Sequence, residues 1–423
     1  MSRILLATLG SLGDLHPYIA TGKALLARGQ HVRLATSIDY RTRVEMAGIE
    51  FAPLAPSIAE LGDREQTARR FFDRWSGPER LFDAMVTAPL RRAYADLRAA
   101  VEGVALAVSH PVTAALPLIA ESRGLPWLSS VLAPYSLFST TDPSVIPNFE
   151  WLHRLPRLGS WPHGLMLNLA RARVRSWERP LHSLRAELGL PPVRGALLID
   201  GNFSPRGTLA LFDPTLAAPQ PDWPVCTRVC GAALHDAGDP QTATAASDEA
   251  LERFLAAGPP PVVFALGSSA VWLARDYWAH AIAACNALGI RGVLLTGTPL
   301  QQRLPSNVAA FDYLPYSRVF SRSTAIVHQA GVGTLSFALR AGRPQLLTPA
   351  GFDQADNAER AVRLGVGRVL PFHRAHNAAR LARELRALLG DPTHARAAAE
   401  IAEKSRGVDG AEAAAQCIID SMS

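Results

Sequence analysis

The sequence predicts an α/β protein built on two separate parallel sheets. Two stretches of the chain repeat one pattern, in which a short apolar run, a glycine-containing turn and a segment of helical periodicity follow one another. The pattern is typical of βα units, because parallel strands are buried on both faces and read as continuous apolar runs. The 423 residues are enough for roughly two to three domains. We therefore expect two Rossmann-like domains.

The first half of the chain carries the first set of βα units. Residues 15–28 have helical periodicity and end before Gly29, which can stop a helix. Two longer helical segments, 54–103 and 134–188, interrupt the rhythm and are rich in aromatic residues. The predicted strands of this half are short apolar runs at residues 3–9, 31–36, 104–108 and 127–132.

A second set of βα units follows a segment of small polar residues, which is typical of a linker. Its predicted strands cover residues 261–266, 292–296, 308–311, 325–327 and 345–348. One last amphipathic helix is expected at 411–422, and the segment that contains it is free to pack back on the N-terminal domain. The predicted division is an N-terminal domain at 1–230, a linker at 231–247, a C-terminal domain at 248–405 and a terminal segment at 406–423.

Composition and charge exclude several classes of protein. The net charge is +6, yet Lys23 and Lys404 are the only lysines and no basic block is interleaved with aromatic residues, so nucleic-acid binding is not expected. No apolar stretch is long enough to span a membrane. The four cysteines form no pattern typical of a disulfide framework or a zinc site, which favours reduced thiols and a cytoplasmic location. The sequence does not indicate an oligomeric state.

The first glycine turn, GSLGDLHP at residues 10–17, lies between the first predicted strand and the first predicted helix. Ligands of open α/β sheets bind where strands end and helices begin, so this turn is a candidate site. The spacing of its glycines does not match the dinucleotide pattern GxGxxG. Asp14 has two interpretations: it caps the following helix, or it serves as a general base.

A second glycine turn, HQAGVGT, begins where a later predicted strand ends. Gly331, Val332 and Gly333 leave backbone amides open, so a diphosphate can bind at the start of the next helix, with Thr334 as a hydroxyl donor and His328 as a positive or donating side chain. Taken alone, the two glycines are also typical of a tight turn. The chain has neither a P-loop motif nor a DxD pair, so no metal is expected on the diphosphate.

Two further turns add polar groups at predicted strand ends. Asp353 and Gln354 combine an acceptor with a mixed donor and acceptor, which suits the vicinal hydroxyls of a sugar, although they fit a helix cap equally well. Ser268 lies in the turn GSSAV after the first strand of the second half. Because the carboxyl ends of parallel strands meet at one edge of a sheet, we expect these turns to face one site.

In this order, the motifs resemble those of the GT-B fold nucleotide-sugar glycosyltransferases of family 1, which include antibiotic, sterol and plant natural-product enzymes. The resemblance covers essentially the whole chain. It is strongest between Tyr313 and Asn357, where YLPY, HQAGVGT, RAGRPQLL, DQ and N follow one another. It implies two Rossmann-like domains that face each other across a cleft, with the acceptor on the first domain and the nucleotide-sugar donor on the second.

The resemblance also implies roles for single residues. Tyr313 takes the place of the aromatic side chain that stacks on the nucleobase, while Asp353 and Gln354 match the pair that binds hydroxyls of the donor sugar. Asp14 falls where antibiotic and sterol members have a catalytic aspartate, and His16 is the second candidate base. The full set of donor-binding residues implied is Ser268, Tyr313, Leu314, His328, Gly331, Val332, Gly333, Thr334, Asp353 and Gln354.

The sequence departs from the family at two positions. The distant aspartate that orients the catalytic histidine of plant members is missing, because the strand end at Ser109 and His110 offers no carboxylate. Asp14 would then act alone or with His110. Ser336 stands where plant enzymes place a glutamate on the ribose, which favours a deoxyribose donor such as a dTDP-sugar over a UDP-sugar.

Within the family, the closest likeness is to the bacterial rhamnosyltransferases of rhamnolipid synthesis, in GSLGDLHPYIA, around 124–134 and in FDQADNAERAVRLG. It implies dTDP-L-rhamnose as donor and a 3-hydroxyalkanoate lipid as acceptor. Such an acceptor would bind near His110, Tyr135 and Phe138 and would bring the enzyme into peripheral contact with membranes. The aromatic-rich helical segments are also typical of plain core.

The sequence therefore predicts a metal-independent, inverting hexosyltransferase with no cofactor besides its nucleotide-sugar co-substrate. Asp14 would deprotonate an acceptor hydroxyl, which attacks the anomeric carbon on the face opposite the leaving diphosphate. Three alternatives stay open: an enzyme that glycosylates a polyketide, flavonoid or macrolide aglycone, a sugar-nucleotide epimerase or phosphorylase, and a non-catalytic helper protein that binds a nucleotide-sugar.

Overall fold

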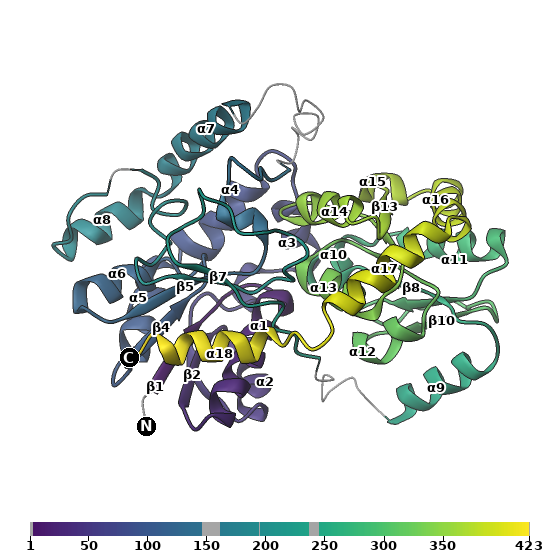
Figure 1. Ribbon diagram of the computed structural model, residues 1–423, viewed down its shortest axis with the longest axis horizontal. Helices are drawn as coiled ribbons and strands as arrows, with labels where there is room; N and C mark the ends of the chain where they lie inside the picture. Colours follow the sequence, from purple (N-terminus) through teal and green to yellow (C-terminus); the bar gives the residue numbers. More distant parts are fainter. Residues whose placement is uncertain (1–2, 146–160, 194, 237–244, 423) are drawn as a thin grey trace. The chain divides into compact units, whose positions relative to one another are not determined.

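The structure is a computed structural model and describes residues 3–145, 161–193, 195–236 and 245–422. The chain divides into two compact units (Figure 1). The first comprises Met1–His235 together with Asp409–Ser423, and the second comprises Asp236–Val408. The division point falls inside the segment predicted as a linker at 231–247, of which residues 237–244 lie outside the described part.

The first unit contains a parallel sheet of seven strands in the order β3-β2-β1-β4-β5-β6-β7. Its strands are β1 (Arg3–Ala7), β2 (His31–Thr36), β3 (Glu50–Pro53), β4 (Leu106–Ser109), β5 (Trp127–Val131), β6 (Thr208–Ala210) and β7 (Thr227–Val229). The strand order reverses between β1 and β4. The carboxyl ends of these two neighbours therefore flank the point at which ligands of such sheets bind.

The second unit contains a parallel sheet of six strands in the order β10-β9-β8-β11-β12-β13. Its strands are β8 (Val262–Ala265), β9 (Gly292–Leu295), β10 (Val308–Phe311), β11 (Ala325–His328), β12 (Gln345–Leu347) and β13 (Gly367–Val369). The order reverses between β8 and β11, as it does between β1 and β4. The two sheets confirm the prediction of two Rossmann-like domains.

Helices follow the strands in both units. Those of the first unit are α1 (Leu12–Ala27), α2 (Arg41–Met46), α3 (Arg64–Phe71), α4 (Gly77–Phe82), α5 (Leu90–Ala100), α6 (Ala115–Arg123), α7 (Trp161–Trp177), α8 (Arg179–Glu187) and α18 (Gly410–Asp420). Those of the second are α9 (Ala245–Ala256), α10 (Gly267–Ala270), α11 (Tyr277–Leu288), α12 (Tyr316–Val319), α13 (Val332–Ala341), α14 (Gln354–Arg363), α15 (Phe372–Ala375), α16 (Ala378–Gly390) and α17 (Pro392–Lys404). No helix of the described ranges is long and apolar enough to cross a membrane.

The first sheet is buried on both faces, as its apolar strands require. On one face, residues of β1 pack with helices α5, α6 and α8 in a cluster that includes Leu5, Leu97, Leu116 and Leu181. On the other face, α1 packs at Gly22, where an added Cβ would lie 2.6 Å from Ile49 Cδ1 and 3.6 Å from Leu6 Cδ1. The glycine thus leaves room for the Ile49 side chain against α1.

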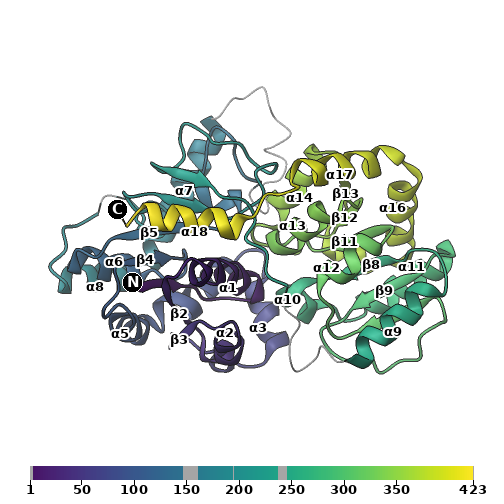
Figure 2. The ribbon, with the colours of Figure 1, turned by 60° about the horizontal axis from the view of Figure 1, so that its bottom comes forward.

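The last helix, α18, lies beside α1 in the first unit, as Figure 2 shows, although the chain reaches it from the second unit. The Asp409 carboxylate caps it by accepting from the Ala411 amide at 3.0 Å. Arg28 at the end of α1 pairs with Glu412 at 2.9 Å and donates to Gln416 Oε1 at 3.1 Å. The amphipathic helix predicted at 411–422 therefore covers α1 and not the second sheet.

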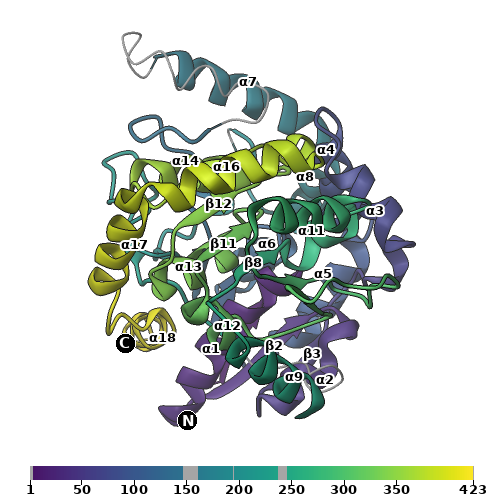
Figure 3. The same ribbon diagram turned by 90° about the vertical axis from the view of Figure 1, so that its right-hand side faces the viewer.

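The second sheet is also covered on both faces. Helices α11 and α16 lie side by side (Figure 3) and pack along β9, β12 and β13. The opposite face buries a cluster that includes Val263, Ile326, Phe320 and Ala338, with Leu251 contributed by α9. The sheet thus lies between two layers of helices, which cover its two faces.

The structure differs from the sequence prediction at several strands and at the start of α1. Strands β3, β6, β7 and β13 were not predicted, and three of them, β3, β7 and β13, are only partly buried and are not continuous apolar runs. Helix α1 begins at Leu12 and not at residue 15, because Ser11 caps it.

The helical segment predicted at 54–103 forms part of the core. Its residues Leu54, Met85, Leu90 and Leu97 are buried in the cluster that contains Leu5, on one face of the first sheet. The interpretation of this segment as plain core is therefore confirmed for these side chains. Of the second helical segment, 134–188, residues 146–160 lie outside the described part.

Candidate active site

Three neighbouring strands bring the predicted residues of the first unit to one edge of its sheet. Asp14 follows β1, His110 follows β4 and Tyr135 follows β5, and these strands are adjacent in the order β1-β4-β5. All three residues therefore lie at the carboxyl edge. Sequence reasoning placed Asp14 and His110 at strand ends and Tyr135 in the helical segment 134–188, and the strand order brings the three together.

The Asp14 carboxylate is fixed by the cap of helix α1. Its Oδ2 accepts from the Ser11 amide at 2.7 Å and from the Ser11 hydroxyl at 3.0 Å, and the Ser11 hydroxyl accepts from the Gly13 amide at 3.2 Å. Gly10, at φ +132°, faces this carboxylate so closely that an added Cβ would lie 2.4 Å from Oδ2. The capping interpretation of Asp14 is thus confirmed, and it leaves Oδ1 outside the cap.

The second carboxylate oxygen of Asp14 faces His110. The distance from Asp14 Oδ1 to His110 Nε2 is 3.7 Å, and the Asp14 side chain is 32% exposed while that of His110 is 9% exposed. Burial lowers the pKa of His110, and the charge of Asp14 only partly opposes this. The buried Nδ1 of His110 has no hydrogen-bond partner among the described residues. Asp14 therefore has one fixed oxygen and one oxygen beside a neutral imidazole.

His16, the second candidate base, is half-buried two residues further along α1. Its ring packs edge-on against that of His235, with ring centres 5.4 Å apart. Burial, with further contributions from the charges of His235 and Arg43, lowers the pKa of His16 to about 3. A base is most effective when its pKa is near the working pH, so this environment places His16 behind Asp14.

Two aromatic residues predicted to contact the acceptor lie after β5. Tyr135 belongs to a short helix, Pro134–Leu137, and Phe138 follows it in the left-handed conformation with φ +52°. Both are half-buried. The loop is fixed by Asp222, which accepts from the Ser139 hydroxyl at 2.7 Å and from the Thr140 amide at 2.6 Å. Acceptor contact by these residues stays a prediction.

Sequence reasoning missed Tyr18. Its ring packs edge-on against His110, with centres 5.9 Å apart, and its hydroxyl pairs with Ser130 Oγ at 2.6 Å. Tyr18 thus supports the histidine that faces Asp14. The available signal was its spacing of four residues from Asp14, which places both on one side of the helix.

In the second unit, the predicted donor residues also follow strands at the carboxyl edge. Tyr313 follows β10, Ser268 follows β8, the turn from Gly331 to Thr334 follows β11, and Asp353 follows β12. Tyr313 and Ser268 are half-buried, whereas the Leu314 side chain is buried in the core. The family resemblance implies that Leu314 contacts the edge of the nucleobase through its backbone, and burial of its side chain is compatible with that.

The first turn of α13 has the geometry of an anion site. Gly331 is its N-cap and provides no side-chain cap, and the turn contains no acidic residue. An added Cβ at Gly333 would meet nothing within 4 Å. The Thr334 hydroxyl is 3.5 Å from the Tyr316 hydroxyl. The amides at this helix start are thus left for a negatively charged ligand.

Of the two states that the sequence predicted for His328, positive or donating, the structure contradicts the positive one. It is fully buried, its Nδ1 accepts from the Ala330 amide at 3.2 Å, and its Nε2 lies 2.9 Å from Gln345 Oε1. Burial lowers the pKa of His328 to about 4, although the bond to Gln345 opposes the shift. The histidine is therefore neutral at pH 7; its Nδ1 holds the turn and its Nε2 is bonded to the side chain of Gln345 in β12. Contact with a diphosphate stays a prediction.

Replacing His328 by Ala is expected to destabilise the protein by about 2–4 kcal/mol, because it leaves a cavity and two unpaired polar groups. The native protein should also lose stability as the pH falls from about 6.5 to 4, by up to about 3 kcal/mol for this group, because only the unfolded chain binds the proton there. Urea unfolding at pH 7 and pH 5 tests this, and the variant should show a smaller pH effect. If acidification tightens dTDP binding in the wild type but not in His328→Gln, the neutral assignment is wrong.

Asn357 connects the turn after β11 with the turn after β12. Sequence reasoning counted it in the run of family motifs but gave it no role of its own. Its side-chain amide donates to the Ala330 carbonyl at 3.0 Å and to Asp353 Oδ2 at 2.7 Å. Ala330 has φ +65°, so this bond secures a backbone position that alanine rarely adopts. Gln354 Oε1 accepts from the Ala350 amide at 2.9 Å, which leaves its NH2 group outside that bond. The signal was the spacing of four residues between Asp353 and Asn357.

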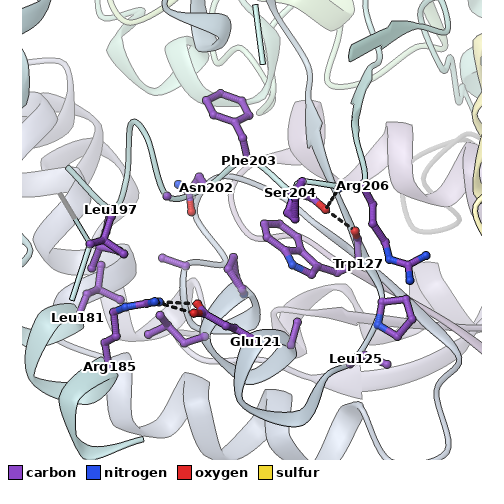
Figure 4. A pocket seen from close by; sticks show the side chains of 18 of the residues that line it. Glu121, Leu125, Trp127, Leu181, Arg185, Leu197, Asn202, Phe203, Ser204 and Arg206 are labelled. Atoms are coloured by element: carbon purple, nitrogen blue, oxygen red, sulfur yellow. Dashed lines mark hydrogen bonds and ion pairs between the residues drawn. The ribbon is translucent and has the colours of Figure 1, made fainter. Parts of the chain in front are cut away.

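A separate cavity of about 560 Å³ lies in the first unit along α6 (Figure 4). Trp127, the first residue of β5, lines it, as does Ser204, which precedes β6. Glu121 and Arg185 form a two-pronged ion pair in its wall at 2.5 and 2.6 Å. Neither Asp14 nor His110 lines this cavity, so it is not the candidate active site.

Known proteins resemble this chain in sequence and in fold. Residues 4–134 match the glycosyltransferase family 28 N-terminal domain, and residues 293–418 match the C-terminal domain of erythromycin biosynthesis protein CIII-like proteins. The chain is 33% identical to O-mycaminosyltylonolide 6-deoxyallosyltransferase of Streptomyces fradiae, over 97% of this chain and 96% of that protein. It is 29% identical to vancomycin aglycone glucosyltransferase of Amycolatopsis orientalis, over 100% of this chain and 98% of that protein. The crystal structure of glycosyltransferase VinC in complex with dTDP superposes with a TM-score of 0.66 at 20% identity, covering 99% of each chain.

The two parallel sheets with sites at their carboxyl edges define a GT-B nucleotide-sugar glycosyltransferase. The chain belongs to family 1 of these enzymes, close to the antibiotic glycosyltransferases, and is a hexosyltransferase. The family assignment from motifs is therefore confirmed. The finer likeness to the rhamnolipid enzymes stays a prediction.

Proposed function

We propose that this enzyme transfers a sugar from a dTDP-sugar to a hydroxyl group of a natural-product aglycone, with inversion and with Asp14 as the general base. The observation that carries the proposal is the state of the Asp14 carboxylate. Ser11 fixes Oδ2 at 2.7 Å, while the side chain stays 32% exposed with Oδ1 beside His110. A carboxylate that is held in place and still reachable suits proton abstraction from a bound hydroxyl.

In the proposed step, Asp14 takes the proton as the acceptor oxygen attacks the anomeric carbon. The bond from that carbon to the diphosphate breaks on the opposite face, and the diphosphate leaves with its negative charge. Amides at the start of α13 stabilise this charge, so they act more strongly in the transition state than on the bound donor. No described group of three or more His, Cys, Asp or Glu side chains could hold a metal ion, and the step is proposed without one.

Two observations support a dTDP-sugar over a UDP-sugar. Ser336, at the position where plant enzymes hold the ribose, is buried, and its hydroxyl donates to the Val332 carbonyl at 2.8 Å. It is therefore engaged within its own helix and offers no carboxylate to a 2′-hydroxyl. The related fold of VinC was solved with dTDP bound.

The names of the relatives support an aglycone as the acceptor. One relative is a vancomycin aglycone glucosyltransferase and another is a deoxyallosyltransferase of O-mycaminosyltylonolide. These names favour the natural-product alternative over the lipid hydroxy acid that the rhamnolipid likeness implies. The buried residues of the segment 54–103 also reduce the apolar surface left for a lipid chain.

A panel of donors and acceptors tests the proposal. We expect dTDP to raise the melting temperature more than UDP at equal concentration, because a ligand at 100 times its Kd stabilises by about 2.7 kcal/mol. Turnover should require dTDP-glucose or dTDP-rhamnose with macrolide or glycopeptide aglycones, and should survive excess chelator. Transfer to 3-hydroxydecanoyl acceptors alone would identify a lipid enzyme, and loss of turnover in chelator would contradict metal independence.

A further inference from the structure

The last helix carries a thiol that faces a second thiol, and the transfer reaction uses neither. Cys417 lies on α18, and Cys230 directly follows β7, so both belong to the first unit. Each thiol interacts with the other, and both contact Arg228. Cys230 is buried, whereas Cys417 is partly exposed. A solvent-reachable thiol therefore interacts with a shielded one, although the two cysteines are 187 positions apart in the sequence.

Arg228 contacts both thiols. Its Nη1 lies 3.9 Å from Cys417 Sγ, and its backbone carbonyl accepts from the Cys230 thiol at 3.5 Å. The hydrogen bond from Cys230, with the charge of Arg228, lowers the pKa of Cys417 to about 6 against the opposing effect of burial. The same hydrogen bond and burial raise the pKa of Cys230. The pair therefore combines a thiolate at Cys417 with a thiol at Cys230, which is the arrangement that reactive cysteine pairs require.

We propose that Cys417 and Cys230 form an oxidisable pair, in which a hydroperoxide attacks Cys417 and Cys230 then closes a disulfide. In the first step, the Cys417 thiolate attacks a peroxide oxygen. The O–O bond breaks, a sulfenic acid forms, and hydroxide or an alkoxide leaves and takes up a proton. In the second step, Cys230 sulfur attacks Cys417 sulfur, the S–O bond breaks, and water leaves with the proton of Cys230. The two thiols are oxidised by two electrons and the hydroperoxide is reduced by two.

The disulfide would change how the last helix is held. In the reduced protein, α18 is attached by its packing on α1 and by partly exposed contacts such as the pair of Arg28 with Glu412, which contribute little each. The disulfide would tie α18 to the end of β7 and enclose the whole second unit, Asp236–Val408, in one covalent loop. Long loops of this kind gain stability when closed, so the oxidised protein should melt higher and keep α18 during limited proteolysis.

The experiment uses the full chain, reduced and then treated with one equivalent of hydrogen peroxide. After the free thiols are blocked with iodoacetamide, peptide mass spectrometry should show Cys230 joined to Cys417 with the loss of two hydrogen atoms, and Cys226 alkylated. Cys226→Ser is the matched control, because Cys226 is exposed, and it should leave the cross-link unchanged. Cys417→Ser should abolish it. Cys230→Ser should leave a sulfenic acid on Cys417 that dimedone traps.

A second measurement does not depend on whether these variants fold. In the wild type, the rate of Cys417 alkylation should reach half its maximum below pH 7, and Arg228→Gln should move this midpoint to higher pH. The proposal is overturned if peroxide drives Cys417 to sulfinic acid while Cys230 remains alkylatable, if the cross-link joins two chains, or if Arg228→Gln leaves the alkylation midpoint of Cys417 where it is in the wild type. These outcomes do not depend on the assignment of donor or acceptor.

Discussion

Replacing Asp14 by Asn is expected to lower the turnover number by about 10²–10⁴, while the affinity for dTDP stays within a few fold. The amide cannot take the proton of the acceptor hydroxyl. Its oxygen can still accept from the Ser11 amide, which lies 2.7 Å from Oδ2 of the native carboxylate, so the start of α1 should be preserved. Steady-state kinetics and calorimetry with dTDP on one preparation measure the two quantities.

A matched control separates catalysis from capping. Ser11→Ala removes the hydroxyl that donates to Asp14 at 3.0 Å and accepts from Gly13 at 3.2 Å, but it leaves the carboxylate in place. It should cost about 1 kcal/mol of stability and leave turnover within a few fold. Near-normal turnover in Asp14→Asn would exclude Asp14 as the base. If His16→Asn then abolished transfer, the base would be His16 despite its low pKa.

Replacing Gly333 by Asp is expected to weaken the binding of dTDP by about 10- to 100-fold without destabilising the protein. An added Cβ at Gly333 meets nothing within 4 Å, and a carboxylate in the first turn of a helix is favourable. The same carboxylate would repel the diphosphate and compete for the open amides of α13. The loss of one charge-assisted hydrogen bond costs roughly 1.5–3 kcal/mol, and 1.4 kcal/mol corresponds to a factor of ten.

Gly164 provides the matched control for this substitution. It also lies within a helix, α7, and an added Cβ there also meets nothing within 4 Å. Gly164→Asp should leave dTDP affinity unchanged. Calorimetry with dTDP and urea unfolding of both variants give the comparison. Unchanged affinity in Gly333→Asp would mean that the diphosphate does not bind at the start of α13, and the assignment of this turn would be wrong.

The strong elements of the fold could be predicted because their signals are local. Strands β2 and β10 lie at the predicted residues, since apolar runs between turns mark buried parallel strands without knowledge of their neighbours. Strands β6 and β7 gave no such signal. Strand β7 is only partly buried, and β6 is defined by its pairing with β7 and with β5, which lies far away in the sequence.

The sequence could indicate which residues are candidates for the site, but not their hydrogen bonds or protonation. Position at a strand end was enough to select Asp14 and His328. Which of their atoms are already bonded depends on Ser11, on Gln345 and on the fold as a whole. For His328, expected to be positive or donating, the surroundings leave a neutral side chain that holds a turn.

The sequence by itself determined two βα repeats, the glycine turns at their strand ends and the order of motifs that marks a GT-B glycosyltransferase. These features depend on neighbours in the chain. Only the tertiary structure decided that α18 returns to the first unit, that Asn357 joins the turns of Asp353 and Ala330, and that Cys417 faces Cys230. The physical reason is that burial and hydrogen-bond partners depend on strand order and on helix packing. Both bring together residues whose separation along the chain carries no periodic signal.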